Sequence, residues 1–123
     1  MQIIELIGRV FISLIFLLAG VRKVFNYEGT ISYMESFSVP SYLLIPAIVV
    51  EIIFPLLIIV GYKTKFSAMI LALFAISLAI IFHTDFSNQI ELMSFLKNFA
   101  IAGGFLIIFV RGAGKYSIDY RLN

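Results

Sequence analysis

Two ionisable side chains lie inside apolar segments of this chain, where a charge is costly. Arg9 lies in the first apolar run, and Glu51 lies near the centre of the second. Ionisable residues within a membrane span normally face the bundle interior and find a partner there. If these two helices run antiparallel, we expect Arg9 and Glu51 to form a buried pair, with Ser13 on the same helical face as Arg9. The alternative is a local pair between Arg9 and Glu5, which lies one turn away.

A second group of polar side chains comes from the ends of three apolar runs. Lys23 follows the first run, His83 follows the third, and Lys97 and Asn98 lie near the start of the fourth. We predict that these four side chains converge near one end of a bundle, with Glu51 deeper below them. Such a cavity would suit a small molecule or a quinone, and the histidine could relay protons. In the simpler alternative, the lysines extend to the membrane interface and the histidine marks the water boundary.

The overall composition indicates that these residues belong to a membrane protein. Of 123 residues, 62% are hydrophobic and 13% are charged, and the mean hydropathy is +1.08. Soluble domains are about 45–50% apolar and about 25% charged, so that class is excluded. Low charge and 15% aromatic residues exclude a disordered chain. A net charge of +2 on so apolar a chain indicates loops that flank a membrane, and we expect no nucleic-acid partner.

The rarity of metal-binding side chains limits the chemistry that this chain can carry out alone. It has no cysteine, which excludes a disulfide scaffold, a thiol redox pair and a cysteine-type zinc site. It has one histidine, and we therefore expect no metal centre made only of its own side chains.

Four apolar runs have the length, or nearly the length, of about 17–25 residues that a membrane-spanning helix needs. They cover residues 3–21, 43–60, 66–82 and 95–110. All six tyrosines lie outside these runs, where amphipathic rings favour the headgroup region. We therefore predict an all-α membrane protein, with one four-helix transmembrane domain over residues 1–123. Short interfacial helices are expected in the outer loops, near residues 26–36 and 86–95.

The distribution of basic residues predicts the orientation of the chain. Four spans place both termini on one side of the membrane, and five basic residues share that side: Lys63, Lys65, Arg111, Lys115 and Arg121. The other side carries Arg22, Lys23 and Lys97. The positive-inside rule then predicts cytoplasmic termini.

Small residues on the helices predict where the helices pack closely. Ala72, Ala75 and Ala79 share one stripe of the third helix. Gly20 in the first helix, and Gly103 and Gly104 in the fourth, are the other predicted packing positions.

The order and spacing of several short motifs resemble the DoxX family of small bacterial membrane proteins. These motifs are Gly8-Arg9, Ala19-Gly20-x-x-Lys23, Glu51, Phe82-His83, Phe95-Leu96-Lys97-Asn98, Ala102-Gly103-Gly104 and Gly112-x-Gly114-x-x-Ser117-x-Asp119. The resemblance implies a four-helix bundle in the bacterial inner membrane. It also implies a link to redox chemistry, since the family is named after subunits associated with a thiosulfate:quinone oxidoreductase.

Three functions remain open on this basis. The leading hypothesis is an accessory subunit of a redox-linked membrane complex, with a quinone or small anion held near His83, Lys97 and Asn98. A quinone is the one cofactor considered, and a partner subunit or that quinone would take up the electrons. The second hypothesis is a non-enzymatic scaffold that docks partner subunits or further copies of itself. The third is a carrier or channel that acts as an oligomer, and whether the chain is an enzyme stays open.

Overall fold

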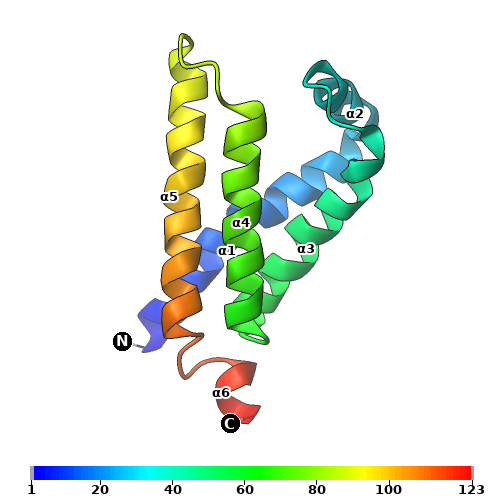
Figure 1. The fold of residues 1–123 in the computed structure, drawn as a ribbon. Helices are drawn as coiled ribbons and strands as arrows, with labels where there is room; N and C mark the ends of the chain where they lie inside the picture. Colours follow the sequence, from blue (N-terminus) through cyan, green and yellow to red (C-terminus); the bar gives the residue numbers. More distant parts are fainter. Residues whose placement is uncertain (1, 123) are drawn as a thin grey trace.

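The computed structural model describes residues 2–122, and this part of the chain contains helices and no strands. The elements in order are α1 (Gln2–Phe25), α2 (Tyr27–Ser36), the 3-10 helix η1 (Ser41–Leu43), α3 (Leu44–Val60), α4 (Thr64–Phe82), α5 (Gln89–Arg111) and α6 (Ile118–Leu122) (Figure 1). Four helical segments are long and apolar enough to cross a membrane, namely Gln2–Phe25, Ser41–Val60, Thr64–Phe82 and Gln89–Arg111. The predicted all-α membrane fold with four spans is therefore confirmed.

The four long helices pack as two antiparallel pairs. Helix α1 packs on α3, α4 packs on α5, and a contact between α3 and α4 joins the pairs. The beginning of α1 and the end of α6 lie at one end of the bundle, which we call the terminal end (Figure 1). Toward the opposite, distal end the two pairs diverge, and α2 lies beside the α1–α3 pair (Figure 1).

The core between the pairs is built on small residues of α4. Ala72, Ala75 and Ala79 are fully buried, as the sequence predicts. Phe16 of α1 fills the space beside this stripe and stacks on Phe105 of α5, with ring centroids 5.9 Å apart. Small side chains on one helix leave room for aromatic rings from its neighbours, and this packing joins the two pairs.

Two of the three predicted packing glycines allow close approach between helices. A Cβ atom on Gly20 would lie 2.7 Å from Cγ1 of Ile52, and one on Gly104 would clash with Cδ1 of Ile12. Nothing lies within 4 Å of a Cβ atom placed on Gly103, so the prediction for that glycine is wrong. Adjacent residues of a helix point in different directions, and Gly104 is the one that faces α1.

The two outer loops differ from each other. The predicted short helix after Asn26 is present as α2. The predicted separate segment near residues 86–95 is wrong, because α5 already begins at Gln89 and continues without interruption. The side chain of Asn88 accepts a hydrogen bond from the amide of Ile90 at 2.9 Å, which caps the first turn and lets the spanning helix begin earlier.

Candidate functional site

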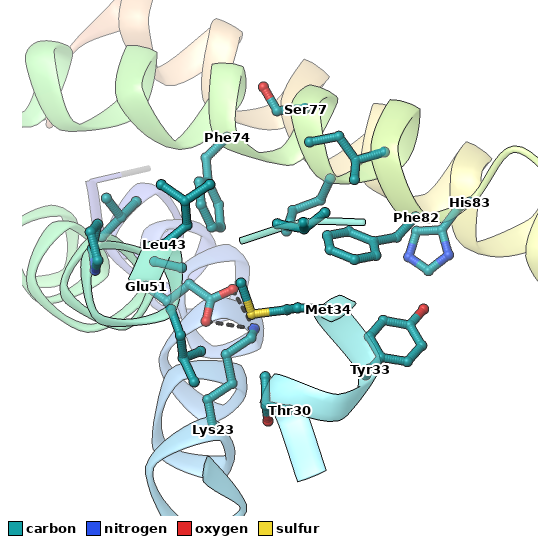
Figure 2. A pocket seen from close by; sticks show the side chains of 17 residues that line it. Lys23, Thr30, Tyr33, Met34, Leu43, Glu51, Phe74, Ser77, Phe82 and His83 are labelled. Carbon is teal, nitrogen blue, oxygen red and sulfur yellow. Dashed lines mark hydrogen bonds and ion pairs between the residues drawn. The ribbon is translucent and has the colours of Figure 1, made fainter. Parts of the chain in front are cut away.

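A cavity of about 400 Å³ lies between the two helix pairs toward the distal end (Figure 2). Its walls come from the end of α1 and from α2, η1, α3 and α4, and they are mainly apolar, with Met34, Val50, Phe74, Leu78 and Phe82 among the lining residues. Small-molecule sites commonly have volumes of about 300–1,000 Å³ and apolar walls with a few placed polar groups. The cavity therefore has the size and character of a ligand site.

An ion pair between Lys23 and Glu51 lies at one side of this cavity (Figure 2). The Nζ atom of Lys23 is 2.7 Å from each carboxylate oxygen of Glu51. The Glu51 side chain is 1% exposed, whereas the Lys23 side chain is 26% exposed. Gly20 lies one turn before Lys23 and brings the backbone of α1 close to Glu51. The sequence predicts both residues as site residues but does not predict that they pair.

The predicted pair between Arg9 and Glu51 is wrong, and the register of α1 against α3 explains why. Arg9 lies opposite the end of α3, where it bonds the carbonyl oxygen of Ile58. Glu51 lies opposite Gly20. Eleven residues of α1, about three helical turns, separate these two positions. The prediction that Arg9, Ser13 and Glu51 are buried is nevertheless confirmed, with exposed fractions of 3%, 0% and 0%.

Arg9 binds backbone carbonyls instead of a carboxylate. Its Nη1 donates to the oxygen of Ile58 at 3.0 Å, and its Nη2 donates to the oxygen of Tyr116 in the C-terminal segment. Among residues 2–122 it forms no ion pair with Glu5, so the local alternative is wrong as well. The guanidinium thereby ties the C-terminal segment to α1 and α3, because its planar group directs donors to two separate acceptors.

His83 lines the cavity at the end of α4 and contacts the beginning of α5. Its Nδ1 lies 3.0 Å from Oε2 of Glu91. Tyr33 of α2 lies nearby, and its ring stacks on Phe82 with centroids 5.4 Å apart. Burial and then the negative charge of Glu91 raise the pKa of the Tyr33 phenol above its ordinary value of 10.0. The phenol therefore keeps its proton at neutral pH and can donate a hydrogen bond.

Lys97 and Asn98 do not belong to this cavity, and their predicted convergence with Lys23 and His83 is wrong. Lys97 lies in a separate groove formed by residues 89–100 of α5. Asn98 donates from Nδ2 to the carbonyl oxygen of Ser94 in its own helix at 3.1 Å. Helix α5 begins at Gln89, six residues before the predicted run of residues 95–110. Lys97 and Asn98 therefore lie within a continuous helix and not at its beginning.

Several residues that complete the site are not predicted from the sequence. Glu91, which binds His83, is one of them. It lies in the first turn of α5, and an acidic residue is favoured at the beginning of a helix, so its position could have been predicted from the sequence. Phe74, Ser77 and Leu78 of α4 also line the cavity. Their spacing places them on one helical face, but the apolar composition of α4 gives no sign of which face lines a cavity.

Comparison with known proteins places this architecture in a family. The DoxX family model matches residues 4–84, which is more than half of the chain. The chain belongs to the DoxX family. It is 37% identical to the inner membrane protein YqjF of Escherichia coli strain K12 over 118 residues, covering 96% of this chain and 91% of YqjF. It is 32% identical to YphA, an inner membrane protein of the same strain, over 126 residues, covering 97% of this chain and 90% of YphA. No solved structure matches the chain.

The matched DoxX region contains every residue that lines the cavity. Residues 112–122 of this DoxX protein lie beyond that region and hold the terminal end together. Ser117 donates from Oγ to the carbonyl of Gly114 at 2.7 Å and accepts from the amide of Tyr120 at 3.1 Å. The amide of Asp119 donates to the carbonyl of Gly61 at 2.7 Å. The C-terminal motif thus has a structural role in this chain.

Asp119 also caps α4 from a distant part of the sequence. Its two carboxylate oxygens accept from the amides of Lys63 and Thr64, each at 2.8 Å. Partial burial raises the pKa of this carboxyl, but the bonds from Thr64 and Lys63 and the charge of Lys63 outweigh it, so the pKa lies below 3.8. A carboxylate at a helix N-terminus satisfies free amides and is favoured by the helix dipole.

Proposed function

We propose that this inner-membrane protein binds a quinone ring in the cavity beside Lys23 and Glu51 and serves as an accessory subunit of a redox-linked membrane complex. The observation that carries the proposal is the buried ion pair at one side of an aromatic, apolar cavity of about 400 Å³. A quinone combines an apolar ring with carbonyl oxygens, and such a cavity offers an apolar wall beside a cation.

Lys23 supplies the hydrogen-bond donor that a quinone carbonyl needs. Its ammonium group has three N–H donors, and the two oxygens of Glu51 accept two of them. The third donor is free for a ligand, and the 26% exposure of the Lys23 side chain is consistent with access to it. Glu51 fixes the position of the ammonium and balances its charge in the low-dielectric interior.

The opposite side of the proposed site is lined by Tyr33, Phe82 and His83. The rings of Tyr33 and Phe82 offer apolar surface, and both residues line the cavity. His83 is bonded to Glu91, a carboxylate that can stabilise the protonated imidazole. An imidazole bonded to a carboxylate can pass a proton from one ring nitrogen to the other, so this pair offers a route for a proton between the cavity and water.

The role of accessory subunit rests on the side chains that the chain offers. A bound quinone would supply two-electron redox chemistry, whereas the chain has no cysteine and a single histidine to hold a redox centre of its own. The electrons would then come from a partner subunit. The family name supports this reading only by analogy of fold.

The proposal is tested by measuring the quinone that co-purifies with the protein. The substitution Ala47→Phe places a ring in the cavity wall without changing Lys23 or Glu51. We expect it to reduce quinone per protein, measured by mass spectrometry after solvent extraction, to the level of a mock purification. Val49→Phe on the exposed side of α3 is the matched control and should leave the quinone content unchanged.

Equal quinone content in both variants and in the native chain would contradict the proposal. Normal assembly of Ala47→Phe with partner proteins, together with no quinone in the native chain, would favour the scaffold function.

A further inference from the structure

The terminal end of the bundle contains a second, larger concave surface that is independent of the cavity. This groove has a volume of about 850 Å³ and is lined by residues of α1, the α3–α4 turn, α4, the end of α5 and the C-terminal segment. Residues 112–122 form one of its sides after folding back across the end of the bundle (Figure 1). The bonds of Arg9 to Tyr116 and of Asp119 to Lys63 and Thr64 hold that side in place.

Four basic side chains from different segments line this groove. Lys63 belongs to the turn before α4, Lys65 to the first turn of α4, Arg111 to the end of α5, and Lys115 to the C-terminal segment. All four residues are exposed. None of them forms an ion pair with another residue in the described range 2–122. The folding of the chain therefore brings together four basic side chains, none of which forms an ion pair with a carboxylate within residues 2–122.

The acidic residues of the groove do not balance these cations. Asp119 has both oxygens occupied by the amides of Lys63 and Thr64. Glu5 packs against Gly114: a Cβ atom placed on Gly114 would lie 2.6 Å from Oε2 of Glu5. With four basic and two acidic residues, the lining carries a net charge of +2. A groove of this charge favours an anionic occupant.

The edge of the groove is apolar and adjoins the membrane-spanning surface. Phe66 is 59% exposed in the first turn of α4, and Tyr120 and Leu122 of α6 are 55% and 68% exposed. These side chains favour acyl chains over water, and tyrosine is favoured at headgroup depth. Basic pockets beside transmembrane helices suit anionic lipid headgroups. We propose that the groove binds the phosphate headgroup of an anionic phospholipid.

Native mass spectrometry of the purified full-length chain tests this site with phosphatidylglycerol as the probe and phosphatidylcholine as the neutral-headgroup comparison. The variant K65Q/R111Q removes one lysine and one arginine from the groove. We expect its affinity for phosphatidylglycerol to fall about tenfold or more, because each basic residue near an anionic surface contributes roughly fivefold. Binding of phosphatidylcholine should be weak and unchanged.

The variant R22Q/K97Q is the matched control, because it removes one arginine and one lysine from exposed positions elsewhere. It should retain the affinity of the native chain, and K65R/R111K should retain it if charge is what the groove provides. Equal losses in K65Q/R111Q and R22Q/K97Q would overturn the proposal. Displacement of phosphatidylglycerol by millimolar inorganic phosphate would also overturn it, since the groove would then be a site for free phosphate.

Discussion

Lys23 and Glu51 form an ion pair across the contact between α1 and α3, with both carboxylate oxygens 2.7 Å from one ammonium nitrogen. The two partners differ in environment, because the glutamate side chain is 1% exposed and the lysine side chain is 26% exposed. Helical side chains tilt toward the helix N-terminus, which brings Lys23 back to the depth of Gly20 and Glu51. The pair therefore fixes the register of two helices as well as one side of the cavity.

This asymmetry predicts that the two single substitutions have unequal costs. Lys23→Met leaves a buried carboxylate without its partner, and we expect it to lower the free energy of unfolding by about 3–5 kcal/mol. Glu51→Gln leaves a lysine that can extend toward water, so the loss should be smaller. The double variant should be more stable than Lys23→Met alone. Unfolding of all four proteins in detergent measures the coupling, and additive losses would show that the pair contributes nothing.

The sequence predicts the membrane spans well because hydropathy is a local property. Each predicted run lies within one of the four segments able to cross a membrane, and buried positions such as Ser13 and Ala75 follow from helical periodicity. The C-terminal ends of the predicted runs at residues 60, 82 and 110 lie within one residue of the ends of α3, α4 and α5.

Pairing between helices is not predictable in the same way, because the register of two apolar helices depends on packing of the whole bundle. Arg9 and Glu51 have similar distances from the ends of their helices, yet α1 is offset so that Arg9 meets Ile58 and Glu51 meets Lys23. The partners of Arg9 are also not predictable from residue types, because it binds backbone carbonyl oxygens and not side chains. Any residue at positions 58 and 116 other than one that distorts the backbone would offer the same acceptors.

Arg9 should be sensitive even to replacement by lysine. Arg9→Lys keeps the charge but replaces a planar group that bonds Ile58 and Tyr116 with a compact ammonium. We expect faster cleavage of the C-terminal segment by trypsin, because residues 112–122 lose one attachment to α1. Arg22→Lys on the exposed surface is the matched control and should leave the cleavage rate unchanged.

A double-mutant cycle of Arg9→Lys and Glu51→Gln, measured by unfolding in detergent, tests whether these two residues interact. If Arg9 and Glu51 act independently, Arg9→Lys combined with Glu51→Gln should change stability by the sum of the single effects, within about 0.5 kcal/mol. A larger deviation would indicate coupling between these residues.

We expect the attachment of α6 to the beginning of α4 to weaken in acid, because it depends on the carboxylate of Asp119. Its pKa lies below 3.8 in the folded protein, so its contribution to stability is fully present above pH 3.8 and is lost as the pH falls through the folded pKa. Asp119→Asn should therefore lower the unfolding temperature at neutral pH, and the difference from the native chain should shrink below pH 3.8. Asp85→Asn in the exposed distal loop is the control. A difference that stays constant from pH 7 to below the folded pKa would contradict the role of the carboxylate.

Gly61 and Gly103 should respond in opposite directions to the same substitution. Gly61 has φ +75°, and a Cβ atom there would clash with Cβ of Ser117 and lie 2.5 Å from Nη1 of Arg9. Gly61→Ala should lower the free energy of unfolding by more than about 1 kcal/mol, because it adds backbone strain to the displacement of both neighbours. Gly103 is helical with nothing within 4 Å of its Cβ position, so Gly103→Ala should raise stability by up to about 1 kcal/mol. Chemical unfolding in detergent compares the two variants directly. Equal effects would mean that the contact of Gly61 with the C-terminal segment does not stabilise the terminal end.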